Sequence, residues 1–226
     1  MDEAPRAALP DAVAPRARDR ASTEDRILAA VGAVLAREGF AGLGVNAVAR
    51  EAGVDKVLIY RYFGGLPELL RAWGQSGRFW PRLQDLLGDE PAALLALPAA
   101  ERYARFFDHF IDELRRRLLT LEILAAEMQQ PNPLTDILDA EREAWGADAS
   151  RVLGGSDFAQ APCLNAVTLL LVMGVQVLLV RTRHTPVFSG IDLHSEAGWA
   201  QIKASIAEVA RRLLPPPPPA GSDAGQ

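Results

Sequence analysis

A short stretch in the N-terminal third of the chain combines basic, aromatic and aliphatic side chains. Lys56 and Arg61 carry positive charge, Tyr60 offers a phenol, and Val57 and Leu58 are aliphatic. Lysine and arginine bind phosphates or guanine edges, tyrosine donates to phosphates, and aliphatic groups contact thymine methyls in a major groove. The combination therefore indicates a surface that binds double-stranded DNA. The alternative is that the aliphatic pair packs against another part of the protein.

Two short helices are predicted to position this stretch. Val48 and Ala49 lie on one face of the first helix, and the small Ala49 allows close approach of a neighbouring helix. Gly53 supplies the positive φ of a sharp turn. Ile59 and Phe63, four residues apart, give the second helix its inward face. This arrangement predicts a helix-turn-helix. The residues predicted to contact DNA are Asn46, Lys56, Val57, Leu58, Tyr60, Arg61 and Tyr62.

An earlier helix should open at Ser22-Thr23-Glu24-Asp25, a hydroxyl N-cap followed by acids. Its apolar residues from Ile27 to Leu35 follow the helical period, and Gly39 should end it as a left-handed cap. Residues 1–20, rich in Ala, Pro and Arg, are predicted to be a disordered arm. The arm's arginines either enter a minor groove or have no role.

Motifs for catalysis and metal binding are missing from the sequence. His109, His184 and His194 have no zinc-like spacing, and Cys163 is the single cysteine. No serine elbow or glycine-rich nucleotide fingerprint occurs, and Gly64-Gly65 follows a helix instead of a strand. The chain is therefore predicted not to be an enzyme, and no cofactor or metal is expected.

The remainder of the chain predicts an all-α protein. Residues 21–66 form the helix-turn-helix domain, residues 67–214 a helical domain, and residues 215–226 a disordered Pro-rich tail. The stretch from Leu164 to Val180 has no charge, but it is short for a membrane span and interrupted by polar residues. Burial by neighbouring helices or by a second subunit is favoured. The helices expected in the second domain are Glu68–Trp80, Ala99–Arg117, Leu118–Met128, Leu134–Leu153, Leu164–Arg183 and Glu196–Leu214.

The region from about residue 22 to residue 72 resembles the DNA-binding domain of the TetR/AcrR family of bacterial transcriptional regulators. The resemblance covers about a quarter of the chain, and the ordered combination of motifs is specific. The matching features in chain order are Gly39-Phe40, Val48-Ala49, Ala52-Gly53-Val54, Ile59-Tyr60-Arg61-Tyr62-Phe63 and Glu68-Leu69-Leu70.

The resemblance implies a homodimer with a small-molecule pocket in the second domain. The abundance of aromatic residues favours a largely apolar ligand, while Asp108, His109 and Glu122 are candidates for orienting one polar group. The predicted ligand-binding residues are Trp73, Trp80, Tyr103, Phe107, Phe110, Met128, Trp145 and Met173. The predicted dimerisation residues are Leu171, Val175, Leu178, Trp199, Ile202, Ile206 and Val209, the last four forming a stripe that is alternatively a core within one subunit.

Several positions depart from the family pattern. Gly44 replaces the usual threonine N-cap, and Asp55 and Leu58 replace hydroxyl residues. Gly65-Leu66 stands where a serine and a phosphate-contacting lysine are usual. These changes weaken the expected set of DNA contacts without affecting the fold.

The charge distribution is compatible with DNA binding by the front of the chain. Residues 1–80 hold 11 Lys and Arg against 10 Asp and Glu, whereas the whole chain has a net charge of −5. The expected function is a cytoplasmic, ligand-responsive regulator, a repressor released from a palindromic operator by a small ligand. The alternative is a TetR-like protein with degenerate DNA contacts that acts as a protein-binding partner.

Overall fold

The computed structural model describes residues 15–129, 132–159, 161, 163–182 and 184–214, so the predicted tail and the first 14 residues of the predicted arm lie outside the described residues. The described residues are almost entirely helical, as predicted for an all-α protein. The elements are α1 (Pro15–Gly42), α2 (Val45–Ala52), α3 (Lys56–Phe63), α4 (Leu66–Gln75), α5 (Leu83–Leu87), α6 (Pro91–Leu95), α7 (Ala99–Arg115), α8 (Leu118–Gln129), α9 (Pro133–Ala159), α10 (Leu164–Arg181), β1 (Val187–Phe188), β2 (Ile191–Asp192) and α11 (Glu196–Leu213).

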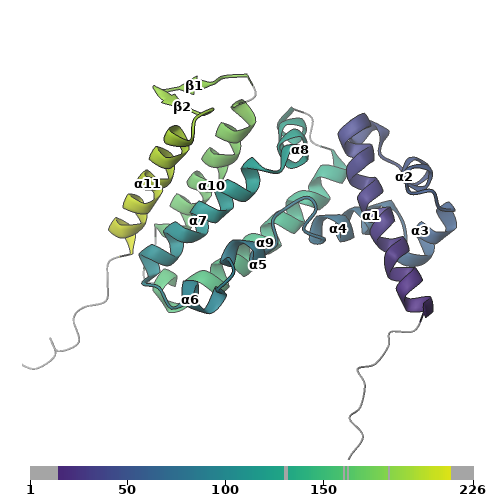
Figure 1. Ribbon diagram of the computed structural model, residues 1–226, viewed down its shortest axis with the longest axis horizontal. Coiled ribbons are helices and arrows are strands. Elements are labelled where there is room, and N and C mark those ends of the chain that lie inside the picture. The colour runs from purple at the N-terminus through teal and green to yellow at the C-terminus, as the bar shows by residue number, and fades with distance from the viewer. Residues whose placement is uncertain (1–14, 130–131, 160, 162, 183, 215–226) are drawn as a thin grey trace, which may run out of the picture.

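The helices form two groups along an elongated molecule. Helices α1, α2 and α3 gather at one end, and α10, α11 and the small hairpin lie at the other (Figure 1). Helix α4 follows α3 and packs against the long helix α9. Because α9 also packs on α7, it connects the N-terminal group to the interior of the second one.

The N-terminal helices share one apolar core. Ile27 and Val31 from α1, Val48 from α2 and Ile59 from α3 are fully buried. Each of these short helices would be unstable in isolation, because most helical stability in proteins comes from packing an apolar face. Packing against the long α1 therefore fixes the orientation of α3.

The turn between α2 and α3 has the geometry that the sequence predicts. Gly53 has φ 63° and ψ 41°, and its N–H donates to carbonyls of the last turn of α2. A side chain at this φ would be strained, which explains the glycine. Arg26 of α1 donates to the carbonyls of Ala52 and Gly53 at 2.8 and 3.2 Å, which ties the turn to the first helix.

The second group is built around α7. Its buried side chains, among them Tyr103, Phe107, Phe110 and Leu114, recur at helical spacing. Helix α11 packs along α7, and α10 packs on α7 and α8. Trp199 of α11 is buried, and its indole N–H donates to the carbonyl of Leu193 at 2.8 Å.

Several predicted boundaries are wrong. Helix α1 begins at Pro15 instead of near Ser22, so residues 15–20 are helical and do not belong to a disordered arm. Helix α9 continues through Gly154, where an end was expected, because this glycine is buried within the packed helix. The hairpin β1–β2, whose tip contains Ser189 at φ 49° and Gly190 at φ 80°, was not predicted, and neither were the short helices α5 and α6.

Candidate DNA-binding surface and ligand cavity

Helix α3 presents its basic and aromatic side chains to solvent. Val57 is 61% exposed and Tyr60 is 54% exposed, while Ile59 on the opposite face is fully buried. Lys56 and Arg61 are also exposed. Val57 and Tyr60 therefore lie outside the protein core, beside two cationic side chains. This exposure excludes the alternative in which Val57 packs against another part of the protomer.

The remaining predicted DNA contacts divide into exposed and partly covered residues. Asn46 on α2 is exposed, and Leu58 is half-buried. Tyr62 is also half-buried, with its hydroxyl accepting from Arg61 at 2.9 Å and the Arg20 guanidinium 5.0 Å from its ring centre. Tyr62 therefore anchors α1 to α3 as well as lying near the exposed face. DNA contact by all of these residues stays a prediction.

Asp55 caps helix α3. Its carboxylate accepts a hydrogen bond from the backbone N–H of Val57 at 2.8 Å. This geometry satisfies one of the helix's unpaired N–H groups, which explains an acid at a position close to the proposed phosphate surface. Gly44, by contrast, gives α2 no side-chain cap.

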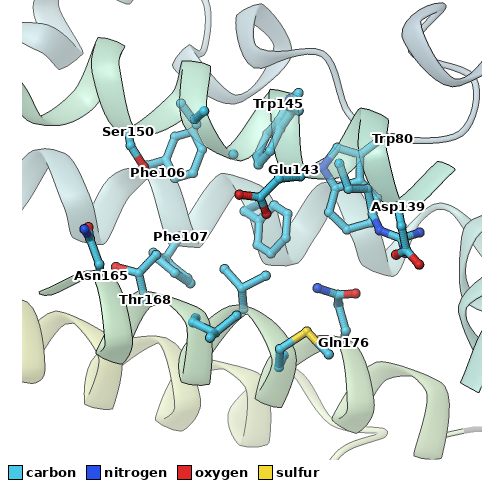
Figure 2. Close-up of a pocket in the computed structure, with 18 of the residues that line it drawn as sticks. Trp80, Phe106, Phe107, Asp139, Glu143, Trp145, Ser150, Asn165, Thr168 and Gln176 are labelled. Atoms are coloured by element: carbon cyan, nitrogen blue, oxygen red, sulfur yellow. The ribbon is translucent and has the colours of Figure 1, made fainter. Parts of the chain in front are cut away.

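A cavity of about 800 Å³ lies between α7, α8, α9 and α10. Its walls are mainly aromatic and aliphatic, with polar side chains at separate points (Figure 2). This size is within the range of roughly 300–1,000 Å³ that small-molecule pockets occupy. The described part of the chain thus contains a space large enough for an organic ligand.

Four aromatic side chains form a connected cluster on one side of the cavity. The ring centres of Trp80 and Trp145 are 5.9 Å apart in an edge-to-face arrangement, and Phe110 lies 5.7 Å from Trp80 and 6.0 Å from Trp145. Phe106 lies 6.0 Å from Trp145. Such spacings are favourable for aromatic pairs. The cluster provides a preformed aromatic wall.

The cavity also contains buried polar groups. Glu127 is buried and makes a two-point ion pair with Arg142 at 2.9 and 3.2 Å. Burial raises the pKa of Glu127, and the ion pair with Arg142 acts in the opposite direction. Burial likewise raises the pKa of Tyr103 to about 12, and its hydroxyl lies 2.7 Å from that of Thr168. Tyr103 is therefore neutral in the physiological range.

Two tryptophans of the cavity wall have unsatisfied donors. The buried indole N–H groups of Trp80 and Trp145 have no hydrogen-bond partner among the described residues. Leaving a buried donor unpaired costs about 1–3 kcal/mol. A ligand or water that supplies an acceptor would recover part of this cost.

The cavity brings together most of the residues predicted to bind a ligand. Trp73 is the exception, because it is fully buried in the core and stacks on Phe79 at 5.4 Å. Asp108 pairs with Lys203 at 3.0 Å, His109 contacts the carbonyl of Leu86, and Glu122 is not among the described lining residues. The predicted residues that do line the cavity are Trp80, Tyr103, Phe107, Phe110, Met128, Trp145 and Met173.

The polar residues of the cavity were not predicted from the sequence. These come from α8, α9 and α10, and each is surrounded in sequence by residues that face elsewhere. The spacing of three and four residues between Asp139, Arg142, Glu143 and Gly146 places them on one side of α9. This spacing could have indicated from the sequence that they face the same space. The missed polar lining residues are Glu127, Asp139, Arg142, Glu143, Ser150, Asn165, Thr168 and Gln176.

The predicted dimerisation residues lie largely inside the protomer. Val175, Trp199 and Ile206 are buried, and Leu171, Leu178, Ile202 and Val209 are half-buried. The outer face of α10 instead exposes other apolar side chains, including Leu170 at 71%. The stripe on α11 therefore packs mainly on α7, which was the alternative for that stripe, and a role of these residues at an interface stays a prediction.

Helix α10 is also long and apolar enough to cross a membrane by length and composition, and 22% of its apolar window is buried in the protomer. One such helix is weak support for a membrane span. Within the described ranges, no group of three or more His, Cys, Asp or Glu side chains is arranged to hold a metal ion.

The N-terminal domain matches the model of a known protein family. The model for bacterial regulatory proteins of the tetR family matches residues 27–73, which run from α1 into α4 and include the exposed face of α3. A search of curated proteins finds no match. Residues 27–73 therefore form a helix-turn-helix domain of the tetR-family type, and a helical second domain follows it.

Solved structures share the fold over most of the chain. A TetR-family regulator from Rhodococcus sp. is 20% identical with a TM-score of 0.58, covering 86% of this chain and 99% of its own. A regulator from Streptomyces coelicolor is 17% identical with a TM-score of 0.55, covering 90% and 98%. The fatty acid degradation regulator FadR of Bacillus halodurans is 15% identical with a TM-score of 0.56, covering 84% and 97%.

Residues 27–73 match the tetR-family model, and most of the chain shares the fold of solved regulators of that family. The similar structures described above are those of transcriptional regulators.

Proposed function

We propose that the protein is a homodimeric bacterial repressor that binds a palindromic operator and is released by a small, largely apolar ligand. The observation that carries the DNA-binding part is the exposed face of α3. Val57 and Tyr60 are exposed between two cations, while Ile59 fixes the helix from behind. A helix held in this way can enter a major groove with its first turns against base edges.

The outer face of α10 supports the homodimer. Leu170 is 71% exposed, and Leu169, Met173 and Val177 are also exposed on the same helix. Gly174 has open space above it, so a second helix can approach closely at this point. Leu169 and Met173 line the cavity, so the outer face consists of Leu170, Gly174 and Val177, which recur at helical spacing. An exposed apolar face of this kind is typical of an interface. A twofold dimer places two recognition helices against successive major grooves, about 34–36 Å apart.

Helix α9 connects the cavity to the DNA-binding domain. Arg142 lines the cavity, while the preceding residue, Glu141, accepts a hydrogen bond from Gln75 of α4 at 2.9 Å. Arg71 of α4 lies 3.7 Å from the same carboxylate. Gly74 packs closely here, because a Cβ on it would lie 3.3 Å from Glu141. A ligand that shifts α9 therefore also moves α4. Because α4 follows α3 directly in the chain, the shift changes the position of α3.

Such a ligand releases DNA only if it binds the two arrangements of the helices with different affinities. Coupling of about 1–3 kcal/mol, or roughly 5- to 150-fold in affinity, is typical of allosteric control. The cytoplasm is the proposed location, because the operator is there.

Fluorescence anisotropy tests the proposal directly. Purified protein is titrated into labelled DNA from the intergenic region flanking its gene, at two salt concentrations and with excess unrelated DNA. We expect tight binding that survives the competitor and weakens steeply with salt, because phosphate neutralisation releases counterions. Failure of a folded dimer to select any genomic fragment would contradict operator binding and favour the protein-binding alternative.

A further inference from the structure

The charged side chains that line the cavity are predominantly acidic. Glu127, Asp139 and Glu143 contribute carboxylates, and Arg142 is the only cationic side chain among the described residues of the lining. Glu127 is buried and paired with Arg142, whereas Asp139 and Glu143 are exposed, so a ligand that enters the cavity meets an excess of negative charge on its open side.

The single cation is already committed to protein partners. Arg142 pairs with Glu127 at 2.9 Å and with Asp139. Its guanidinium also lies 5.6 Å from the ring centre of Phe79 and 5.8 Å from that of Trp80. Binding an anionic ligand through Arg142 would require these ion pairs to break, and removing one partner of a buried pair is costly.

Glu143 and Gln176 are among the polar side chains of the lining that have no protein partner within the described residues. Glu143 makes no hydrogen bond or ion pair there, and Figure 2 shows its carboxylate between aromatic rings, directed into the cavity. Gln176 of α10 is only 5% exposed and also lacks a partner, and its amide points into the cavity from the opposite side. The amide of Gln176 is not among the fully buried unpaired groups, so its donors and its acceptor are accessible to a ligand in the cavity.

The aromatic cluster lies beside the free carboxylate. Trp80, Phe106, Phe110 and Trp145 are connected by ring contacts of 5.7–6.5 Å between centres. Ring faces attract organic cations, and the attraction increases when the cation leaves water. Ring faces repel an anion because the ring quadrupole is negative there, whereas the unpaired indole N–H groups of Trp80 and Trp145 can donate to a polar acceptor elsewhere on the same ligand.

We propose that the ligand of this cavity is an organic cation with bulky aromatic or aliphatic groups. Its charged centre lies near Glu143 and the aromatic cluster, and Gln176 contacts it or an adjacent polar group. This inference rests on the proposed function in one respect, namely that the cavity is the effector site.

A set of probes that differ in charge but share aromatic bulk tests the inference. Tetraphenylphosphonium is a cation, tetraphenylborate is an anion of nearly the same shape, and triphenylphosphine oxide is neutral. Binding to the full-length protein is measured by calorimetry without DNA, so the result does not depend on the operator. We expect the cation to bind at least about tenfold more tightly than either of the other two.

Substitutions locate the binding. Glu143→Gln keeps the shape of the side chain and removes its charge, so we expect it to weaken the cation about tenfold and to leave the neutral probe unchanged. Gln176→Leu should weaken the cation as well. Glu101→Gln is the matched control, because Glu101 is exposed at the start of α7, is not among the lining residues, and its substitution changes the net charge equally.

Equal affinity for the three probes, preference for the anion, failure of the cation to bind, or insensitivity of the cation to Glu143→Gln would each overturn the inference. Circular dichroism and thermal melting show whether each variant is folded. DNA release is then measured separately. Cation binding without DNA release would contradict the proposed repressor mechanism but support the proposed ligand class. DNA release by the neutral probe alone would support the repressor mechanism but contradict the ligand class.

Discussion

Single residues on α3 determine how the protein can meet DNA. Lys56 and Arg61 supply charge, Tyr60 a donor, and Val57 an apolar contact, all on an exposed face. Asp55 adds an opposing negative charge near the helix N-terminus, although its carboxylate is used to cap the helix. The contributions to DNA affinity and to helix stability can therefore be separated residue by residue.

Lys56→Ala should weaken DNA binding similarly for all sequences and reduce the slope of log affinity against log salt by about 1, because one phosphate contact is lost. The fold should be unaffected, since Lys56 is exposed. Arg105→Ala, which removes a positive charge from an exposed position on α7, is the control. Anisotropy across several salt concentrations measures both slopes, and equal slopes for wild type and Lys56→Ala would exclude the contact.

Asp55→Asn and Asp55→Ala should behave differently. Asparagine retains the N-cap and removes the negative charge, so DNA affinity should rise with little change in stability. Alanine also loses the hydrogen bond to Val57, so the free energy of unfolding should fall by about 1 kcal/mol. Urea unfolding and anisotropy together check this pair. A lower affinity for Asp55→Asn would show that the carboxylate helps binding.

At the scale of whole elements, α9 serves both the cavity and the DNA-binding domain. Glu141 contacts α4, and Arg142, one residue later, pairs with buried Glu127 beside the ligand space. Adjacent residues of a helix point about 100° apart, so one helix can present a residue to each side. This arrangement makes α9 the element whose position both DNA and ligand can influence.

Glu141→Ala should uncouple the two sites. The contacts with Gln75 and Arg71 are lost, so we expect the ratio of DNA affinities without and with a saturating effector to fall toward one. Affinity for the effector alone should change little, because Glu141 does not line the main cavity. Asp136→Ala, an exposed acid on α9, is the control. An unchanged ratio would place the coupling in another element.

The pH dependence of stability tests the environment of Glu127. Burial raises its pKa in the folded state, so the folded protein retains this proton to higher pH than the unfolded chain. The stabilisation is complete below the ordinary pKa of a glutamate and is lost as the pH rises through the raised value. The free energy of unfolding of wild type minus that of Glu127→Gln should therefore decrease with rising pH. Urea titrations measure this difference, and an increase would show that the ion pair with Arg142 outweighs desolvation.

Some structural elements could be predicted from the sequence and others could not. The helix-turn-helix was predictable because Gly53 fixes the turn and Ile59 fixes the inward face, both by local rules. The outward face of α10 was not, because an uncharged helix has no polar stripe to mark its exposed side. Leu171, Val175 and Leu178 were therefore predicted to form the dimer interface, whereas the structure exposes Leu170 and its neighbours. The aromatic residues of the cavity were predicted from their abundance, but the pairing of Glu127 with Arg142 requires the tertiary fold.

At the scale of the whole molecule, helices α10 and α3 lie toward opposite ends (Figure 1). Dimerisation through α10 would thus leave both α3 helices free for DNA. The apolar surface of α10 is unfavourable in water and favourable when covered by a second copy. The net negative charge of the second domain does not prevent dimerisation through α10, because the exposed apolar residues of α10 carry no charge that would repel a second copy.

Leu170→Glu should dissociate the dimer, because a buried interface would then contain unpaired charges. DNA affinity should fall with it, since two half-sites require two subunits. Leu118→Glu is a close control, because Leu118 on α8 is 70% exposed and Leu170 is 71% exposed. Sedimentation velocity over a range of concentrations measures the assembly. A dimer that persists in Leu170→Glu would assign the interface to another face.

The most direct test of the account is selection of genomic DNA fragments by the wild-type dimer and by Tyr60→Ala, followed by footprinting of the selected fragments. We expect wild type to enrich a palindromic sequence and to protect two half-sites whose centres are about 10 base pairs apart or a multiple of this. Tyr60→Ala, with its exposed side chain removed, should lose most of this enrichment while remaining folded. Equal enrichment by both proteins, or none by a folded wild-type dimer, would contradict the claim that the exposed face of α3 reads the operator.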